Sequence, residues 1–540
     1  MSAPVKVDPL EPAPRPRSSF RSAGLISALT LLSRVFGLAR EQVFAALLGA
    51  GPQAEAFQVA FRIPNLLRDL FAEGALSAAF VPTYARAMAE GKDRAHQLAS
   101  RLLTVLAVVL GALVLVGVIL ARPLVSLMAP GFEREPGKTD LTVLLTRVML
   151  PFLPIVSFAA VAMGVLNAQQ KFGTPAAAPA VFNVVAIACG ALLYVLGWSP
   201  AAVAVGWAVG TVLGGIAQFA IQLPPLVRSG WRFRPDFAPN DPAIRTIARL
   251  MTPATVGLGA VQVNIFVSTM FASHEPGAVA WLQYAFRILY LPIGVFGVAL
   301  GTIATTGFAL RAAADDMEGV RHTLRQSLRM LGFLTVPATA GLMVLAVPIV
   351  RLLFERGHFK PTDTHATAVA LVLYALGLVS YTGVKVLAPA FYALGAPRVP
   401  VIASASAVAT NLMLILALHG VIGYRAIALG TSLGSLAQAG ILAVALQSRV
   451  GGLRGHELGS AFAKMVAAAA VMGGVAWAAW ALIERQAGTR GLTAQLVTCL
   501  APIGLGVAVY LAAAWALGLP ELSSLADSMR RRRPPQTDRT

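Results

Sequence analysis

Two arginine-rich patterns near the start of the chain lie inside stretches that are otherwise apolar. The pattern Arg-x5-Arg-acid occurs first as Arg34, Arg40 and Glu41 and again as Arg62, Arg68 and Asp69. On a helix the two arginines of each pattern would lie about 9 Å apart along the axis. A guanidinium binds phosphate through paired hydrogen bonds and keeps its charge when it is removed from water. The spacing therefore favours a site for a phosphate-bearing anion.

Acidic and amide side chains accompany the second pattern. Arg62, Asn65, Asp69 and Glu73 fall within one helical stripe about 80° wide, and Glu55 precedes them. A stripe of this kind cannot face lipid, so we expect it to line a wet interior, with the acids in gating or salt-bridge roles. Internal salt bridges that hold helices together are the alternative, above all for Arg62 with one of the acids.

Two further cations, Arg287 and Lys385, each lie in an apolar stretch. No acid lies within one helical turn of Arg287, which predicts a mobile counter-ion for this side chain. Lys385 is alone in its stretch, and snorkelling to a membrane interface is its alternative role. Bases exceed acids by about two in the whole set, so the cavity that they would line suits an anion.

The composition indicates that membrane helices position these residues. Of the 540 residues, 57% are hydrophobic and 12% are charged, and the mean hydropathy is +0.72. Soluble domains carry about 25% charged residues, so the chain is expected to be an all-α polytopic membrane protein. The net charge of +19 then reflects loop charge and contact with anionic lipid, and we expect no nucleic acid as a partner.

No pattern in the sequence indicates catalysis or a bound cofactor. Cys189 and Cys499 lie far apart, and the seven histidines lack metal-binding spacing. The phosphate-binding pattern GxxxxGK[ST] is absent from the sequence, which argues against ATP hydrolysis by this chain. We therefore expect a protein that is not an enzyme and that holds no metal or cofactor.

We expect fourteen transmembrane helices, because that many stretches are long and apolar enough to cross a bilayer. They are residues 22–49, 57–87, 101–121, 141–168, 176–197, 201–226, 247–273, 278–310, 322–354, 365–393, 397–418, 423–448, 460–484 and 492–518. With the N-terminus inside, about 25 Lys and Arg lie in inner segments and about eight in outer loops. The positive-inside rule therefore predicts that both termini are cytoplasmic.

An internal repeat divides the chain into two parallel six-helix repeats plus two extra C-terminal helices. Gln58–Ile63 matches Gln283–Ile288 at five of six positions, an offset of 225 residues. Repeated halves are typical of transporters, with the substrate site between them. The predicted parts are a disordered tail over 1–21, an N-lobe over 22–226, a C-lobe over 247–448, a helix pair over 460–518 and a basic tail over 519–540.

Several motifs resemble those of the MurJ (MviN) family of lipid II flippases. The resemblance is carried by Ser33–Glu41, Phe61–Pro82, Ala129–Phe132, Gly297–Thr302 and Val384–Pro389. It covers about residues 22–518, and the second of these blocks is the most specific. The resemblance implies fourteen helices of the multidrug/oligosaccharidyl-lipid/polysaccharide exporter type, with helices 13 and 14 forming a groove for a lipid tail.

The resemblance also implies a substrate and residue roles. The cargo would be lipid II, the undecaprenyl-diphosphate-linked disaccharide pentapeptide, moved by alternating access from the inner to the outer leaflet of the bacterial inner membrane. Arg34, Arg40, Arg68 and Arg287 match the family's cavity arginines, the last three near the diphosphate. Glu55 matches an acid that closes the outer side. Membrane lipids and cell-wall synthesis enzymes are further expected partners.

The chain departs from the family pattern at two places. Positions that carry acids near the helix 8 arginine in some members hold Phe286 and Tyr290 here. Some members bind sodium between helices 7 and 11, where Asn411 is the one candidate ligand that stands out and Ile415 occupies a position suited to a polar partner. Membrane potential is therefore the expected drive, and the sequence leaves sodium coupling open.

Two other functions stay open at the level of sequence. One is export of polysaccharide precursors or drugs by a member of the same superfamily. The other is a non-transporting scaffold that gathers cell-wall enzymes. Alanine substitutions at Arg40, Arg68 and Arg287 separate the scaffold from a transporter, because a scaffold would not need these charges.

Overall fold

Every regular element in the described part of the chain is a helix. The computed structural model describes residues 19–71, 75–452, 455–489 and 491–530, and no strand occurs within these ranges. A helix satisfies its backbone hydrogen bonds within one segment, which is what a lipid environment demands. The all-α prediction is confirmed for these residues.

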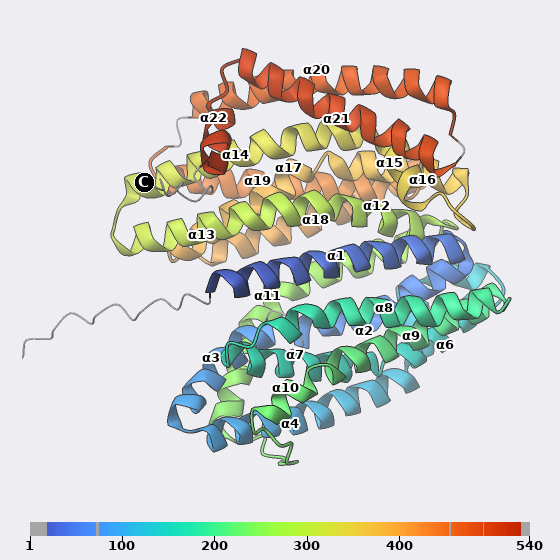
Figure 1. Cartoon of the computed structure of the whole chain (residues 1–540), viewed down its shortest axis with the longest axis vertical. Helices are drawn as coiled ribbons and strands as arrows, with labels where there is room; N and C mark the ends of the chain where they lie inside the picture. Colours follow the sequence, from blue (N-terminus) through green and yellow to red (C-terminus); the bar gives the residue numbers. More distant parts are fainter. Residues whose placement is uncertain (1–18, 72–74, 453–454, 490, 531–540) are drawn as a thin grey trace, which may run out of the picture.

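The helices of the first half of the chain pack into one group, coloured blue to green in the lower part of Figure 1. They are α1 (Ser19–Leu48), α2 (Pro52–Phe71), α3 (Ala75–Glu90), α4 (Lys92–Ile119), α5 (Ala121–Met128), η1 (Pro130–Arg134), α6 (Lys138–Met149), α7 (Phe152–Ala168), α8 (Gly173–Val195), α9 (Pro200–Ala220) and α10 (Leu223–Arg228). Helix α1 packs along α8 and lies on the side of this group that faces the second half. That position brings the arginines of α1 to the boundary between the halves.

The second half forms a corresponding group above it in Figure 1. Its helices are α11 (Pro242–Ala272), α12 (Ala278–Pro292), the π-helical turn η2 (Ile293–Gly297), α13 (Val298–Ala313), α14 (Met317–Val344), α15 (Ala346–Phe354), α16 (Pro361–Ala375), α17 (Leu378–Ala393), α18 (Arg398–Ile422) and α19 (Arg425–Arg449). Asp241 caps the start of α11 by accepting a hydrogen bond from the Ala243 N–H. Helix α11 contacts both α3 and α18, so it connects the two groups.

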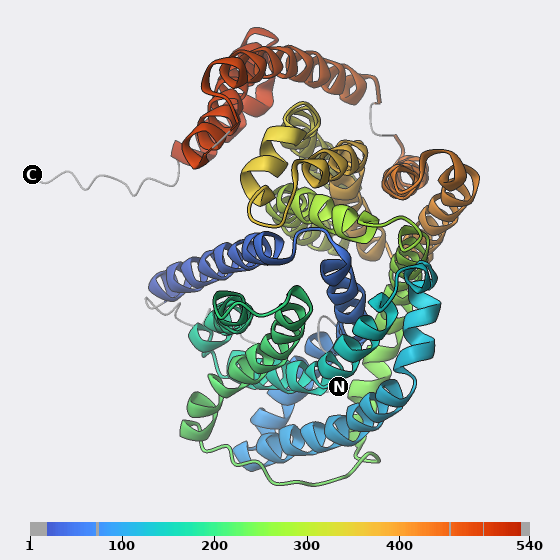
Figure 2. The same ribbon diagram turned by 90° about the vertical axis from the view of Figure 1, so that its right-hand side faces the viewer.

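Three C-terminal helices lie on the outside of the second group. They are α20 (Gly455–Ala487), α21 (Leu492–Ala516) and α22 (Pro520–Arg530). Figure 2 shows the α20–α21 pair at the edge of the molecule, and α20 packs against α14. The expected tail over 519–540 is helical as far as Arg530, where Glu521 pairs with Arg329 at 2.5 Å. Of the expected tail over 1–21, residues 19–21 already belong to α1, and residues 1–18 lie outside the described ranges.

Ten spans among the described residues are long and apolar enough to cross a membrane, or eleven if the bent pair α16 and α17 counts as one. The expected number of fourteen is therefore not confirmed. The three expected spans outside this count coincide with α1, with α2 and α3 together, and with α11. Each of these segments contains residues that the structure does not describe in full, so the count does not test these three spans.

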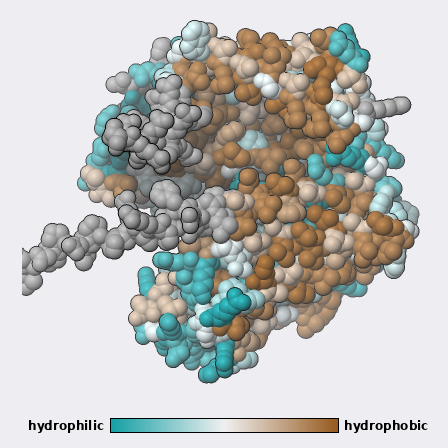
Figure 3. All heavy atoms as spheres, in the orientation of Figure 1, coloured by the Kyte–Doolittle hydropathy of each residue, from teal (hydrophilic) through white to brown (hydrophobic). Residues whose placement is uncertain are grey.

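The molecular surface matches a bilayer environment. Figure 3 shows hydrophobic residues along the flanks of the helices and hydrophilic residues gathered at their ends. Large apolar side chains on these flanks are open to the surroundings, among them Val195, Val421 and Trp515. In water such a surface would be a liability, so the chain is a multi-pass membrane protein.

The two groups approach each other closely at the end where α6 and α16 begin. The N–H of His358 donates to the carbonyl oxygen of Ala46 at 2.9 Å. The N–H of Gly131 donates to Ser273 Oγ at 3.0 Å, and a Cβ at Gly131 would lie 2.2 Å from the Ser273 carbonyl oxygen. Backbone contacts this short leave no passage through these points, so this end is closed.

Candidate substrate site

Glu41 joins two arginines from different halves of the molecule. Its Oε1 lies 2.8 Å from Nη2 of Arg40 on the same helix and 2.7 Å from Nη2 of Arg287 on α12. The Arg40 guanidinium also lies over the Phe182 ring, 5.4 Å from its centroid. The predicted cavity residues Arg40, Glu41 and Arg287 thus meet at the boundary between α1 and α12.

The expectation of a mobile counter-ion for Arg287 is wrong for this structure. The sequence argument searched one turn of α12 for an acid and found none, whereas Glu41 lies 246 residues away in sequence. The Arg287 side chain nevertheless stays 42% exposed while Glu41 is 13% exposed. Arg287 therefore combines a fixed partner with a face that a second anion can reach.

Arg62 also bridges the two halves, but through neutral groups. Its Nη1 donates to Thr269 Oγ1 of α11 and its Nη2 donates to Gln283 Oε1 of α12, both at 2.6 Å. The alternative of a salt bridge to Asp69 or Glu73 is not tested, because the side chain of Asp69 and all of Glu73 lie outside what the structure describes. Arg62 acts as a hydrogen-bonded link between α2 and the second half.

The remaining predicted substrate residues are more scattered. Arg34 is exposed, and its Nη1 would lie 3.6 Å from a Cβ placed on Gly294 in η2. Arg68 and Asn65 are half-buried on α2, and Asn65 Oδ1 has no hydrogen-bond partner among the described groups. Lys385 is exposed on α17 and lines a pocket in the second half. The structure therefore brings Arg40, Glu41 and Arg287 together. Lys385 instead belongs to the lining of the pocket, which does not include Glu41.

Glu55 forms a buried ion pair at the closed end. Its Oε2 lies 2.6 Å from Nζ of Lys138, and both side chains are 1% exposed. Its Oε1 accepts a hydrogen bond of 3.0 Å from the N–H of Val279, at the start of α12. Lys138 also pairs with Glu135 at 2.7 Å and lies over the Phe132 ring. Glu55 thereby ties α2 and α6 of the first half to α12 of the second.

Sequence reasoning did not identify Lys138 as a partner of Glu55. The Glu135-x-x-Lys138 spacing is a recognisable helical ion pair, but nothing in the sequence links it to Glu55, 83 residues away. Thr269 and Gln283, the partners of Arg62, were missed too. Gln283 belongs to the repeated Gln-x-Ala-Phe-Arg-Ile motif, and this repetition could have marked Gln283 as a candidate functional residue.

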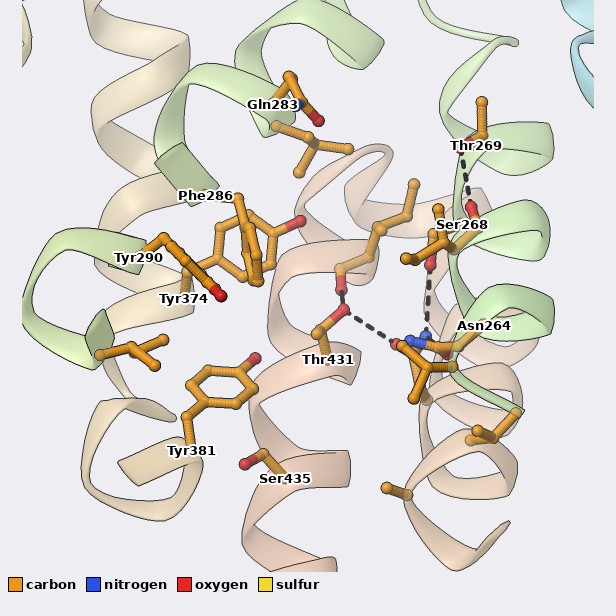
Figure 4. Close-up of a pocket in the computed structure, with 18 of the residues that line it drawn as sticks. Asn264, Ser268, Thr269, Gln283, Phe286, Tyr290, Tyr374, Tyr381, Thr431 and Ser435 are labelled. Atoms are coloured by element: carbon orange, nitrogen blue, oxygen red, sulfur yellow. Dashed lines mark hydrogen bonds between the residues drawn. The ribbon is translucent and has the colours of Figure 1, made fainter. Parts of the chain in front are cut away.

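Asn411 lies in a hydrogen-bonded cluster that fits a sodium ion poorly. Its Nδ2 donates to Asn264 Oδ1 at 2.6 Å and to Ser268 Oγ at 3.4 Å, and Thr431 Oγ1 donates to its Oδ1 at 3.4 Å. Figure 4 shows this cluster on one side of the pocket. Hard cations are held by oxygen ligands that usually include carboxylates. No aspartate or glutamate is among the described residues lining this pocket, and the amide and hydroxyl groups already pair with one another.

Comparison with known proteins places these features in one family. The family model described as "Lipid II flippase MurJ" matches residues 44–498. A probable lipid II flippase MurJ of Vibrio cholerae is 34% identical, with 92% of this chain and 96% of the relative covered. The lipid II flippase MurJ of Burkholderia cenocepacia is also 34% identical, with 92% and 97% covered. A further probable MurJ, from Rhizobium tropici, is 36% identical, with 94% and 96% covered.

Solved structures show the same fold. A lipid II flippase MurJ in an inward closed conformation superposes with a TM-score of 0.74 at 23% identity, covering 94% of this chain and 100% of that one. An inward-facing multidrug resistance transporter of the MATE family, in the MOP superfamily, gives a TM-score of 0.66 at 18% identity, covering 80% and 99%. At these identities the matches speak for the fold alone.

Proposed function

The chain belongs to the lipid II flippase MurJ family, and we propose that it moves lipid II across the bacterial inner membrane. The cargo would be the undecaprenyl-diphosphate-linked disaccharide pentapeptide, carried from the cytoplasmic to the outer leaflet. The observation that carries the proposal is the meeting of Arg40, Glu41 and Arg287 between the two halves. Moving the cargo across the membrane forms and breaks no covalent bond and needs no catalytic group. We therefore propose transport without an enzymatic reaction.

The arginines would hold the diphosphate. Arg287 is partly open and Arg40 lies beside it across Glu41, while Arg34 and Arg68 carry further positive charge on α1 and α2. The Glu41 carboxylate supplies the negative charge that both Arg40 and Arg287 contact. A diphosphate carries more negative charge than one carboxylate, so it would compete with Glu41 for Arg287.

The proposed architecture follows the repeat. Helices α1–α10 would form the N-lobe and α11–α19 the C-lobe, with fourteen spans in total and both termini in the cytoplasm. The pair α20 and α21 would form the groove for the polyprenyl tail. The connections from α3 to α4, from α10 to α11 and from α13 to α14 all lie at one end of the molecule (Figure 1). Basic residues lie in these connections or in the helical turns beside them, at Lys92, Arg94, Arg232, Arg234, Arg311 and Arg321, which supports placing that end inside.

The proposed mechanism is alternating access. The closed end, where Glu55 pairs with Lys138, would be the outer gate, and the cargo head would enter from the inner side. Binding of the diphosphate would neutralise the arginines and permit the inner side to close. Membrane potential would supply the energy, because a field of 100 mV acts on a net charge with about 2.3 kcal/mol per charge.

Depletion of the protein combined with a leaflet-specific assay for lipid II tests this function. Wild-type protein should restore outer-leaflet lipid II, while Arg287→Ala and Arg40→Ala, made at normal levels, should lower its appearance by about tenfold or more. Arg485→Ala, outside the proposed site, is the control and should behave as wild type. Undiminished appearance of outer lipid II after depletion would remove the proposal.

The same experiment decides the alternatives. A polysaccharide-precursor or drug exporter would leave the lipid II pool unaltered on depletion. A scaffold for cell-wall enzymes would support growth with all three of Arg40, Arg68 and Arg287 replaced by alanine. The likeness to the MATE transporter adds little to the exporter alternative, since it concerns the fold alone.

A further inference from the structure

A cavity of about 580 Å³ lies within the second half of the molecule. It runs between α11, α12, α17, α18 and α19, with Arg62 of α2 at one end and Lys385 of α17 among its lining residues. This volume falls in the range of roughly 300–1,000 Å³ typical of small-molecule sites. None of the roles assigned above uses the cavity as a whole.

The two walls of the cavity differ in chemistry, as Figure 4 shows. One wall is aromatic: the Phe286 ring lies 5.4 Å from Tyr374, 6.3 Å from Tyr290 and 6.5 Å from Tyr381, measured between centroids. The opposite wall carries the amides and hydroxyls of Asn264, Ser268 and Thr431. Aromatic faces paired with amides and hydroxyls suit a ring that is apolar on its faces and polar at its edge.

The cavity lining includes the buried hydroxyl of Ser435, which has no partner among the described groups. Ser435 is 4% exposed, and its Oγ makes no hydrogen bond to any described group. A buried hydroxyl without a partner costs about 1–3 kcal/mol, so a ligand that supplies a donor or acceptor here would recover that energy. Nearby, Gln438 Nε2 donates to Ser404 Oγ at 2.9 Å, which places further polar groups beside Ser435 in the lining.

The charge of the lining defines the class of ligand. No aspartate or glutamate is among the lining residues that the structure describes, which disfavours a cation. Arg62, hydrogen-bonded to Thr269 and Gln283, and Lys385 are the cations of the described lining, whereas the aromatic wall and the wall of amides and hydroxyls carry no charge. The arrangement favours a ligand that joins an anionic group to an uncharged part with several hydroxyls and amides, such as an N-acetylated sugar next to a phosphate.

The cavity shares helix α12 with the arginine site. Phe286 and Tyr290 line the cavity, and Arg287, next to Phe286 in sequence, meets Glu41 of α1. Along the helix axis Arg287 lies about 1.5 Å from Phe286 and about 4.5 Å from Tyr290, so the two sites lie within one helical turn of each other. A diphosphate on Arg287 and a sugar in the cavity would therefore be held by two faces of one helix.

We propose that this cavity is the binding site for the N-acetylated sugars of the cargo head. The proposal rests on the proposed transport of lipid II and assigns one part of that cargo to one part of the site. The arginines take the diphosphate, and the aromatic and amide walls take the neutral disaccharide.

A pocket-filling substitution tests the assignment. Ala407 lines the cavity from α18, and Ala409 is exposed on the same helix. Ala407→Trp in lipid nanodiscs should weaken binding of lipid II by about tenfold or more but change binding of undecaprenyl diphosphate by less than about twofold. Ala409→Trp should leave both unchanged. Equal losses for the two lipids, or none for lipid II, would overturn the proposal.

Two additions keep the test decisive. Undecaprenyl diphosphate carrying the disaccharide without the peptide should show the same loss as lipid II, whereas a loss confined to the peptide-bearing lipid would reject the sugar assignment. If Ala407→Trp does not fold, Ser435→Ala replaces it, with Ser406→Ala as its control, and should weaken only the sugar-bearing lipids. If wild-type protein binds none of the three lipids, the proposed function itself has failed.

Discussion

Glu41 decides how the arginines of the two halves behave when no cargo is bound. One carboxylate oxygen serves both Arg40 and Arg287, so the ion pairs hold α1 against α12 and also occupy the groups that would bind a diphosphate. The Glu41 side chain can therefore compete with a diphosphate for the arginines and also help to hold the two halves together. Removing its charge should then strengthen binding of the diphosphate but slow transport of lipid II.

Glu41→Gln keeps the shape of the side chain and removes its charge. A hydrogen bond to a charged group contributes about 1.5–3 kcal/mol, so undecaprenyl diphosphate should bind about tenfold more tightly once Arg287 is released. Transport of lipid II should nevertheless slow, because cargo that is held more tightly leaves more slowly. Binding to purified protein and flipping in vesicles measure the two effects, with Glu90→Gln, on the exposed end of α3, as control. Weaker binding would mean that Glu41 positions the arginines and does not compete with the ligand.

The Glu55–Lys138 pair is a buried ionic contact at the closed end. Removing one partner of a buried pair leaves an unpaired charge and costs about 3–5 kcal/mol, whereas replacing both can be neutral. Glu55→Gln and Lys138→Met should each lower the melting temperature, and the double variant should recover much of the loss. Thermal unfolding in detergent measures all three, and Arg122→Met, on an exposed pair with Asp140, serves as control. Additive losses in the double variant would contradict a direct coupling.

At the scale of the elements, the sequence predicted the positions of the helices better than the contacts between them. The length of the apolar stretches placed α8, α18, α19 and α21 within four residues at each end, because a transmembrane helix depends on its own composition. The start of α4 was missed by nine residues, since its first turns are polar. The π-helical turn η2 was not predicted. It lies where Gly294 and Gly297 permit close packing: a Cβ on Gly297 would lie 3.1 Å from Thr382.

The candidate site was predictable only as a set of residue types. Arg40, Glu41 and Arg287 were identified because charge in an apolar helix is costly, but the contact between Glu41 and Arg287 depends on how α1 packs beside α12, which no spacing within one helix encodes. The pairing of Lys138 with Glu55 was missed for the same reason. Asn411 was noted as a single residue, and only the fold shows that it forms a hydrogen bond with Asn264.

At the closed end, backbone contacts between elements leave no room for a methyl group. Gly131→Ala would place a Cβ 2.2 Å from the carbonyl oxygen of Ser273, at the end of α11, and neither backbone can yield easily. We expect this variant to open the proposed outer gate. A cysteine at buried Ala50, in a background without the native cysteines, should react several-fold faster with a membrane-impermeant maleimide on intact cells. Gly111→Ala, where a Cβ meets no atom within 4 Å, is the matched control. Unchanged labelling would show that this contact does not hold the gate.

For the molecule as a whole, the internal repeat acquires a structural meaning. Arg62 and Arg287 are related by the repeat, and each extends from its own half to the other: Arg62 to Thr269 and Gln283, Arg287 to Glu41. The equivalent arginines thus link the halves in both directions. A movement of one half against the other must break or rebuild both links, which couples the arginine site to the state of the whole protein.

The energy source is a property of the whole molecule as well. The cluster around Asn411 contains no described carboxylate and is internally hydrogen-bonded, so sodium has no evident ligand set there, whereas the arginines carry charge that a membrane potential can act on. One charge moved through 100 mV gains about 2.3 kcal/mol, which is on the order of 50-fold in an equilibrium constant. In vesicles, flipping of lipid II should fall by at least about tenfold when valinomycin and potassium abolish the potential. Replacing sodium by choline at constant potential should change it by less than about twofold. A rate that follows sodium and ignores the potential would reverse this assignment, and it would direct attention back to Asn264, Asn411 and Thr431 as ligands.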